Sequence, residues 1–435
     1  MALGYHEQFV AWASADAVTT EYTIGSLGFT PKAVMVVCMG FRSDDPTSAG
    51  TGSNDWNASI GFANSSGTRR SVASFSDDAN AAANDCGVMA RDDAVLHCVD
   101  GAGALTGALD IAFDADGIRL IVDDTAPVDL SVLVKIWGGN DIKTVVVGDI
   151  AEPAATGNVD YTATGMVAGA EDQVLFLAGV QSTAALNSGQ GQDAGMFFGM
   201  AHNTGQWVNC INSDDASATS DTDHYGISGE CLAQIILGGG NPDARASFVQ
   251  WGTDNFRLNW LARATTNRRS IFMAIRGGRW AVGELTIDAA TLNSTATVSG
   301  LPFQPAGLLL ATSSGAEEAA GVSATLAALS IGGGLSASNR RCLVLREDNG
   351  AATTAVWTSV RHDCAVAMQN NGTATRERWD INAINADGFQ LITDQNNAAD
   401  STAWWIGYMA FAGRPSYPLD ARPHNPDWYP ALLHH

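Results

Sequence analysis

The sequence predicts an all-β protein of three tandem homologous β-sandwich domains, jelly-roll-like in type, followed by an extended proline-rich C-terminal tail. Turn-forming residues are abundant, with 46 glycines and 36 aspartates, whereas helix-forming charged residues are scarce, with three lysines and ten glutamates in 435 residues. Short apolar or alternating runs lie between clusters of Gly, Asp, Asn and Ser, which is the pattern of strands and turns. The same order of features occurs three times along the chain, which indicates three copies of one unit.

Each copy opens with strand-forming segments and continues with an apolar strand that has glycine at its centre. The openings are "FVAWASADAVTTEYTIGSLGFTPKAVMVV", "VVVGDIAEPAATGNVDYTATGMVAGAEDQVLFL" and "WAVGELTIDAATLNSTATVSGLPFQPAGLLLA". The glycine-centred strands are "ASIGFA" (58–63), "AGMFFGMA" (194–201) and "AALSIGGG" (327–334). The anchors recur about every 135 residues, which leaves room for roughly eight strands in each copy and fits a two-sheet sandwich. The strand order cannot be derived from these patterns.

An acidic pair follows the next strand in each copy. The aligned residues are Asp77–Asp78, Asp214–Asp215 and Asp348–Asn349. Because the pair recurs at one place in the repeat, we predict a turn at the end of a strand there rather than a metal site. Cys86 aligns with Cys231 and Cys364, and each is expected to be a small buried residue at the start of the following strand.

A hairpin is predicted near the end of each copy. In "DADGIRLIV" the pair Asp116–Gly117 is expected to supply the positive φ angles of a tight turn, and alternating apolar residues follow it. Asn255 takes this place in the second copy, and Asp387–Gly388 repeats it in the third. "DADG" also resembles the start of a calcium-binding loop, but the bidentate glutamate that such a loop needs is missing.

The closing glycines of each copy set the expected domain limits. They are an N-terminal arm (1–7), three sandwiches (8–140, 141–279 and 280–414) and a C-terminal tail (415–435). The tail combines prolines, which keep a chain extended, with Tyr417, Trp428 and Tyr429. Such aromatic residues suggest that the tail packs along a neighbouring domain or subunit, with simple disorder as the alternative.

Charge and cysteine usage exclude some classes of function. The net charge of −23 argues against binding nucleic acid. The pairs Arg69–Arg70, Arg268–Arg269 and Arg340–Arg341 are expected to be rim charges beside strands. Seven cysteines without a CxxC motif are typical of reduced thiols in a protein made in the cytosol. Neither an export signal nor an apolar stretch of membrane-spanning length is recognisable.

Enzymatic signatures are not apparent, so we expect no catalytic, metal-binding or cofactor-binding residues. The chain has no GxSxG, GxxxxGK[ST] or HExxH motif, and none of its histidines recurs at an aligned position in all three copies. His224, near Asp221 and Asp223, is the one candidate for chemistry confined to a single copy, although acidic loops that contain histidine are usually only solvated.

The tryptophans near turns and strand ends are the remaining candidates for ligand binding. Rings beside Asp and Asn could stack on sugars while the carboxylates accept hydrogen bonds from hydroxyl groups. The candidates are Trp56, Trp207, Trp251 and Trp357. For any single tryptophan, packing in a core or an interface is the more common role.

The pattern "GFTPKA…ASIGFA…SVASFSDDANAA…C…DADGIRL…" over residues 26–120 resembles a repeat of tailed-phage and prophage virion proteins. That repeat has a "GF-x-P-K/D-A" strand, which the first copy matches at Phe29, Pro31, Lys32 and Ala33. The third copy matches it more loosely at Phe303, Pro305 and Ala306, and the second copy has lost it. The shared motifs are structural, so the resemblance implies a setting in a virion without transferring any catalytic or ligand-binding residue.

The leading hypothesis is therefore a non-enzymatic structural protein of a bacteriophage particle, assembled in the cytoplasm of the bacterial host. It would be a tail-fibre or tail-tip component or a capsid decoration. The expected partners are other virion proteins, further copies of the chain and possible glycans of the host surface, without membrane insertion. The first alternative is a carbohydrate-binding adhesin or receptor-binding module. The second is a hydrolase that uses an acidic pair in one copy.

Overall fold

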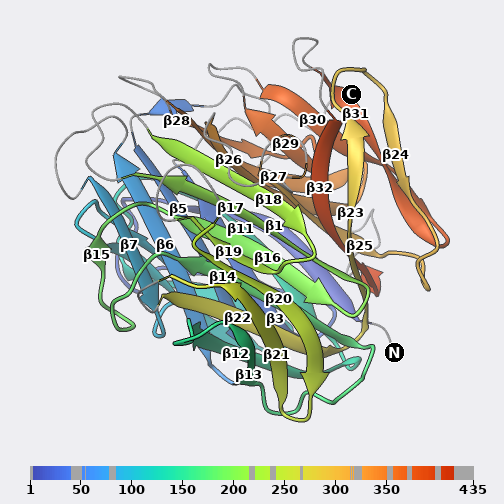
Figure 1. Ribbon diagram of the computed structural model, residues 1–435, viewed down its shortest axis with the longest axis horizontal. Coiled ribbons are helices and arrows are strands. Elements are labelled where there is room, and N and C mark those ends of the chain that lie inside the picture. The colour runs from blue at the N-terminus through green and yellow to red at the C-terminus, as the bar shows by residue number, and fades with distance from the viewer. Residues whose placement is uncertain are drawn as a thin grey trace.

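The computed structural model describes residues 3–40, 51–53, 55–77, 85–214, 221–235, 242–264, 268–313, 315, 317, 326–349, 356–369, 375–396 and 403–415. Its regular structure in these ranges consists of strands alone. Six antiparallel sheets pair as three two-sheet sandwiches, which confirms the predicted fold class. We call the sandwiches unit 1 (β1–β11), unit 2 (β12–β22) and unit 3 (β23–β32). In Figure 1, β5–β7 of unit 1 lie on the left, β12, β13 and β21 of unit 2 at the bottom, and most of unit 3 on the right.

Each unit has a large sheet and a small sheet. In unit 1 the large sheet contains β1 (Gly4–Trp12), β3 (Pro31–Met39), β5 (Asp55–Asn64), β6 (Arg69–Asp77), β7 (Cys86–Arg91) and β11 (Leu130–Gly138), and the small sheet β2 (Glu21–Ile24), β8 (Leu96–Val99), β9 (Leu105–Asp114) and β10 (Gly117–Asp124). In unit 2 the large sheet contains β12 (Ile142–Ala151), β14 (Gln173–Val180), β16 (Met196–His202), β17 (Gly205–Ser213), β18 (Thr222–Ser228) and β22 (Arg269–Gly277), and the small sheet β13 (Gly157–Thr162), β19 (Leu232–Gln234), β20 (Ala244–Gly252) and β21 (Asn255–Ala262). In unit 3 the large sheet contains β23 (Arg279–Asp288), β25 (Gly307–Thr312), β26 (Leu326–Ser336), β27 (Asn339–Asp348), β28 (Val356–Arg361) and β32 (Ala403–Ala412), and the small sheet β24 (Thr295–Val298), β29 (Val366–Gln369), β30 (Thr375–Asn385) and β31 (Gly388–Gln395).

The strand order, which the sequence left open, is the same in all three units. The large sheets have the orders β7-β6-β5-β3-β11-β1, β18-β17-β16-β14-β22-β12 and β28-β27-β26-β25-β32-β23. The small sheets have the orders β2-β10-β9-β8, β13-β21-β20-β19 and β24-β31-β30-β29. The repeat seen in the sequence is therefore a repeat of topology, and each of these ten strands of a unit has a counterpart in both other units.

The units exchange short segments in a cycle. The two-residue strand β15 (Gln190–Gly191) of unit 2 pairs with β7 at the edge of unit 1. The three-residue strand β4 (Thr51–Ser53), between β3 and β5 of unit 1, pairs with β28 at the edge of unit 3. Glu317 of unit 3 accepts hydrogen bonds from the backbone and hydroxyl of Ser228, at the end of β18 in unit 2. Units 1 and 2 thus contribute a short strand to a neighbour and unit 3 contributes the Glu317 side chain, in the order 1 to 3, 2 to 1 and 3 to 2.

The large sheets bury both of their faces. One face packs on the small sheet of the same unit and forms a separate apolar cluster there. The opposite faces of the three large sheets meet in one shared cluster, which we call the central core. Trp137 of unit 1 contacts Phe176 of unit 2 and Phe411 of unit 3, with ring centroids 5.4 Å and 6.3 Å apart. A hydrophobic core common to all three repeats therefore holds the ring of units together.

The glycine at the centre of each apolar strand is explained by a close approach of backbone. A Cβ atom on Gly61 would lie 1.7 Å from the carbonyl oxygen of Val95, in the connection that leads to β8. Gly199 meets the carbonyl oxygen of Cys231 in the same way, and Gly332 that of Ala365, at 2.1 Å and 2.2 Å. Only glycine leaves room for the chain to cross there from the large sheet to the small sheet.

The predicted hairpins exist, but the reason given for them is wrong. In unit 1 the turn consists of Ala115 and Asp116, while Gly117 already pairs with Asp114. In the three described hairpin turns, 114–117, 252–255 and 385–388, Asp254 alone has a positive φ, of 58°. Gly117 is needed instead because a Cβ atom there would lie 2.4 Å from the carbonyl oxygen of Ile24.

The aspartate of each hairpin turn holds the loop beside it. The carboxylate of Asp116 accepts a hydrogen bond from the backbone N–H of Gly28 (2.6 Å). Asp254 does the same for Gly165, and Asp387 for Gly300, at 2.7 Å and 3.2 Å. These carboxylates are therefore structural in all three units.

Other expectations about elements need partial correction. Asp77, Asp214 and Asp348 do lie at the ends of the equivalent strands β6, β17 and β27, whereas Asp78 and Asp215 fall outside the described residues. Cys86 begins β7, but Cys231 and Cys364 precede β19 and β29, so the alignment of the three cysteines is wrong by one strand.

The expected limits at the two ends of the chain also differ from the structure. Residues 4–7, assigned to an arm, are the first half of β1. Of the tail, only Pro415 is described: β33 (Arg414–Pro415) pairs in parallel with Gly4–Tyr5, and residues 416–435 fall outside the described part. Unit 3 thereby closes onto the first strand of unit 1. The described residues include no helix long and apolar enough to cross a membrane.

Candidate functional sites

Three of the four tryptophans proposed to stack on a ligand are buried, so the expectation of exposed rings is wrong for them. Trp56, Trp207 and Trp251 have 1%, 0% and 2% of their surface exposed. Trp207 packs across the interface onto Gly407 of unit 3 and donates a hydrogen bond to the carbonyl oxygen of Tyr408 (3.0 Å). Trp357 is half-buried in β28, and ligand stacking there stays a prediction.

The polar end of the central core lies where β6, β17 and β27 end. The residues just before the three strand-end aspartates meet there. The Ser76 and Ser213 hydroxyls lie 3.1 Å apart, and Ser213 donates to Oε1 of Glu347 (3.1 Å). Trp56 donates to Oε2 of the same carboxylate (2.9 Å). The buried Glu347 carboxylate of unit 3 thus accepts hydrogen bonds from both of the other units. The hydrogen bond from Trp56 explains why this side chain points inward.

A fully buried ion pair also lies in the central core, in unit 1. Lys135 on β11 donates to Glu7 on β1 (2.6 Å), and both side chains are 0% exposed. The Tyr5 hydroxyl donates to the same carboxylate oxygen (2.6 Å), and Arg341 of unit 3 lies 3.7 Å from the other oxygen. Burial raises the pKa of the Glu7 carboxyl, but the two cations and the hydrogen bonds outweigh it, so the net direction is downward. The pair is structural, because no solvent reaches it.

The acidic group suggested for a hydrolase lies at the end of the large sheet of unit 2. Burial, together with the carboxylates of Asp193, Asp221 and Asp223, raises the pKa of Asp214 to about 7. His224 is buried in β18, where it faces the side of the strand opposite to its neighbour Asp223. The described residues contain no group of three or more His, Cys, Asp or Glu side chains placed to hold a metal ion.

Unit 2 carries a second ionisable group in an unusual place, at the end of its sandwich. Glu152 follows β12 and is 4% exposed, and its carboxylate faces the backbone of Ala264 and Arg268 without well-formed hydrogen bonds. Burial raises its pKa to about 7, against the opposing effects of the Ala264 backbone and of the charges on Arg268 and Arg263. In unit 1 the strand register places the buried Trp12 at the corresponding position.

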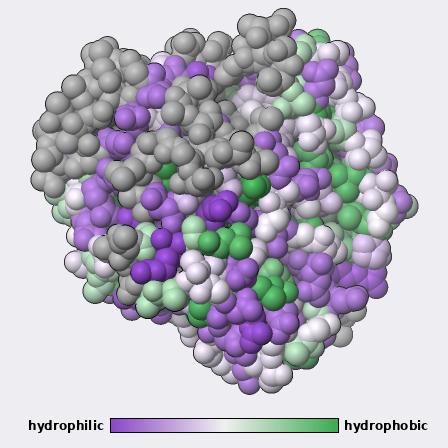
Figure 2. Space-filling model, in the orientation of Figure 1, coloured by the Kyte–Doolittle hydropathy of each residue, from purple (hydrophilic) through white to green (hydrophobic). Residues whose placement is uncertain are grey.

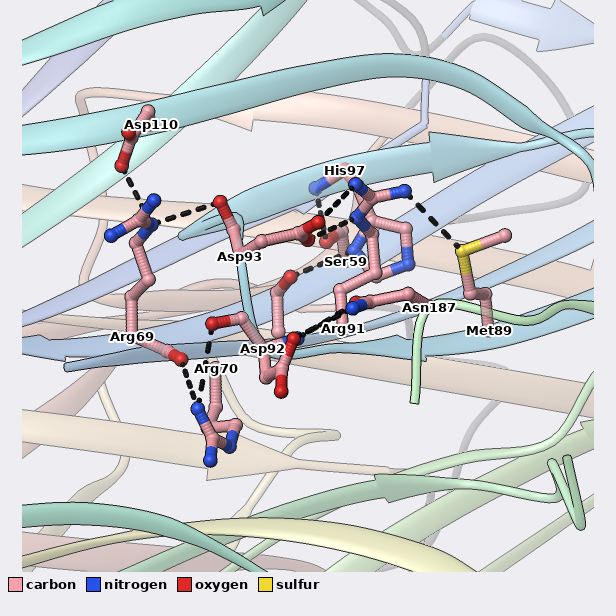
Figure 3. A network of polar contacts seen from close by, with 11 residues as sticks. Ser59, Arg69, Arg70, Met89, Arg91, Asp92, Asp93, His97, Asp110 and Asn187 are labelled. Carbon is pink, nitrogen blue, oxygen red and sulfur yellow. Dashed lines mark hydrogen bonds and ion pairs between the residues drawn. The ribbon is translucent and has the colours of Figure 1, made fainter. Parts of the chain in front are cut away.

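A polar network joins unit 1 to the segment that unit 2 contributes (Figure 3). Arg91 forms a bidentate ion pair with Asp93 (2.8 Å and 2.9 Å). Asp92 and Asn187 exchange two hydrogen bonds, from the Asn187 amide to the carboxylate (2.7 Å) and from the Asp92 backbone to the Asn187 oxygen (3.1 Å). The buried His97 shares a hydrogen bond with the Ser71 hydroxyl (2.8 Å). Burial, and after it the nearby charge of Arg91, lowers the pKa of His97 to about 3. The network fastens two units.

The arginine pairs expected at the rim connect elements instead. Arg70 of unit 1 pairs with Asp149 of unit 2 (3.1 Å), and Arg341 approaches Glu7 as described above. Arg340 pairs with Asp380 inside unit 3 (2.7 Å), and Arg268 is only 7% exposed. Sequence reasoning missed these roles because the contacting residues lie on strands that are distant in sequence, and for Arg70 and Arg341 they belong to different units.

A surface hollow of about 380 Å³ lies at the hairpin between β16 and β17. It is lined by the hairpin residues 202–206 and by Phe248 and Val249 of β20. Val249 is 44% exposed, whereas His202 is 5% exposed and is held by the carbonyl oxygen of Glu171 (2.9 Å). The Gln206 amide and the Thr204 hydroxyl bind the backbone of Phe248 and Val282, so Asn203 and Val249 provide the exposed polar and apolar side chains of the hollow. The coloured surface in Figure 2 shows apolar side chains in several small separate patches rather than in one broad area.

No protein-family model and no curated protein matches the chain.

Proposed function

We propose that the protein is a non-enzymatic structural component of a bacteriophage particle, exposed as a tail-fibre or tail-tip part or as a capsid decoration. The observation that carries the proposal is the closed ring of three units around one core. A single chain thus forms a ring of three similar units, as a cyclic trimer does with three subunits. Such a ring can match a threefold-symmetric partner. The resemblance of the repeat to virion proteins points the same way.

The distribution of polar groups supports an assembly role. The buried carboxylates Glu7 and Glu347 bind side chains of neighbouring units. The turn aspartates hold loops, and Asp92 fastens a segment of another unit. These carboxylates are thus engaged in holding the ring together, and the function we propose is binding through the outer surface.

The test is to locate the chain in purified particles. Mass spectrometry of gradient-purified virions is expected to find it in a fixed ratio to the major capsid protein. Immunogold labelling of the same particles separates a tail location from a head location. Recovery of the chain only in the lysate, and not in particles, would overturn the proposal.

A carbohydrate-binding adhesin is the second candidate, favoured by the hollow beside Val249. Its volume suits one or two sugar rings, the exposed Asn203 side chain offers a polar group for hydroxyls, and the exposed Val249 offers an apolar face for a ring. A glycan array should then show binding that Val249→Glu abolishes. Val18→Glu, at a valine 50% exposed in unit 1, is the matched control. Loss of binding in both variants, or no binding at millimolar sugar, would contradict this candidate.

A further inference from the structure

Unit 3 contains two thiols in direct contact. Cys342 lies on β27 of the large sheet, and Cys364 lies in the connection that enters β29 of the small sheet. Their sulfur atoms are 3.6 Å apart, and both residues are 0% exposed. Together with Val344 and Ala367 they form a small cluster between the two sheets. Two cysteines from opposite sheets of one sandwich therefore face each other without a bond.

In unit 1, the residue that corresponds to Cys342 also links the large sheet to the small sheet. Cys342 pairs with Gly332 on the neighbouring strand, just as Ser71 pairs with Gly61 in unit 1 and Val208 with Gly199 in unit 2. In unit 1, Ser71 reaches across to His97 of the small sheet (2.8 Å). Unit 2 has an apolar valine at this place, and unit 3 has the thiol pair.

We propose that Cys342 and Cys364 form a redox site, at which a small hydroperoxide converts the two thiols into a disulfide between the sheets of unit 3. One thiolate attacks the peroxide oxygen, so that the O–O bond breaks, a sulfenic acid forms and one water leaves. The second thiol then attacks the sulfenic sulfur, the S–S bond forms and a second water leaves. Two thiols and one hydrogen peroxide thus give one disulfide and two waters.

The contact between the two sulfur atoms allows the disulfide to form with little movement. The sulfur atoms must move from 3.6 Å to about 2.0 Å, which a change of side-chain torsions in contacting residues can supply. The bond would close a loop of 22 residues in sequence separation, and such a cross-link stabilises chiefly by restricting the unfolded chain. A hydroperoxide is small enough to enter through local opening of the sandwich.

The surroundings of Cys364 set the rate at which the two thiols are oxidised. Burial raises the pKa of the Cys364 thiol, and contact with Cys342 raises it further, while the Arg361 guanidinium partly opposes them. The reactive thiolate is therefore scarce at neutral pH. Oxidation should be slow there and become faster as the pH is raised.

The experiment uses the full chain purified under reducing conditions and then exposed to hydrogen peroxide at neutral and at mildly alkaline pH. Remaining thiols are alkylated, and peptides are mapped without reduction. We expect a cross-linked peptide pair that contains Cys342 and Cys364, formed faster at the higher pH. The Tm of the oxidised protein should rise by a few degrees and return to its starting value with dithiothreitol.

The controls separate this pair from general oxidation. Cys342→Ser and Cys364→Ser should each abolish the rise in Tm, whereas Cys86→Ser, at a buried cysteine of unit 1, should retain it. Peptide mapping of the wild-type chain decides the matter even where a variant does not fold. Cross-links only between other cysteines, sulfinic acid at Cys342 or Cys364 without a cross-link, or a cross-link that leaves Tm unchanged or lower would each overturn the proposal.

Discussion

At the scale of single residues, unit 1 differs from the other two units because it buries charge in the central core. The strand registers place Glu7 and Lys135 opposite each other, and the corresponding pairs are Val147–Met273 in unit 2 and Val282–Met409 in unit 3. In each of the other two units, an apolar pair thus occupies the position of this ion pair. Because burying two charges costs desolvation energy, the ion pair need not add stability, although removing one partner alone strands the other.

We therefore expect Lys135→Met to destabilise the protein by about 3–5 kcal/mol, because Glu7 would stay buried without its closest cation. The triple variant Tyr5→Phe, Glu7→Val, Lys135→Met removes every partner of the pair in unit 1 and should recover most of this loss. Urea unfolding of both variants measures the difference. A triple variant as unstable as the single one would show that the two sites are not equivalent.

Glu152 makes the stability of the fold depend on pH. Its pKa is about 7 in the folded chain and 4.5 without the fold, so the unfolded state releases its proton first. The stability associated with the neutral carboxyl is complete below pH 4.5 and falls by about 3 kcal/mol as the pH rises through 7. Glu152→Gln should remove this share of the decline and leave the share that comes from Asp214, which unfolding free energies measured across the range will show. Glu171→Gln, at an exposed glutamate, should leave the decline as it is.

At the scale of elements, the sandwiches depend on close backbone crossings and on segments exchanged between units. Each central glycine lies beneath the connection from the large sheet to the small one, as Gly61 does beneath Val95. The exchanged segments pair with the edge strands β7 and β28, which would otherwise present unpaired N–H and C=O groups.

Gly61→Ala should destabilise the chain by about 3 kcal/mol or more, because the added carbon would overlap the carbonyl oxygen of Val95 and force the two sheets apart. Gly25→Ala is the matched control, since a Cβ atom there meets only Thr23 at 3.8 Å. Thermal unfolding compares the two. Equal Tm values would mean that the crossing is easily deformed.

The contact between Asp92 and Asn187 should fasten the exchanged segment of unit 2. Asn187→Gly removes both hydrogen bonds, and glycine tolerates the positive φ of Asn187, 65°. Asp92→Ala removes only the hydrogen bond that the carboxylate accepts, because the Asp92 backbone N–H remains. We expect faster amide exchange at residue 187, whose N–H binds the Ala90 oxygen, and in β15, at a cost of about 1 kcal/mol. Asn203→Ala, at another exposed asparagine, should not change this exchange. Unchanged exchange in both variants would assign the segment's order to other contacts.

At the scale of the whole molecule, the three repeats form one cooperative body. Each large sheet buries its inner face only against the other two, and the ring closes where β33 pairs with β1. Ion pairs and hydrogen bonds such as Arg70–Asp149 and Trp56–Glu347 cross every unit boundary. A single unit removed from the ring would expose its share of the central core.

The fragment of residues 141–279, unit 2 alone, is therefore not expected to persist as a folded monomer. It would expose the apolar face that holds Phe176, Met273 and Phe198, so it should aggregate or self-associate. Size-exclusion chromatography and circular dichroism of the fragment test this, with the full chain as control. A monomeric, cooperatively unfolding fragment would show that the units are independent domains.

The sequence by itself determined the fold class, the number of units and the places of many turns, because these follow from local patterns that the chain repeats. Asp77, Asp214 and Asp348 end equivalent strands as predicted, and the hairpins near Asp116 and Asp387 lie where the pattern placed them. Only the tertiary structure decided what the side chains contact. Trp56 and Trp207 were expected to be available to ligands but are buried against other units. The physical reason is that burial in this ring arises between segments more than a hundred residues apart, and local periodicity carries no information about such contacts.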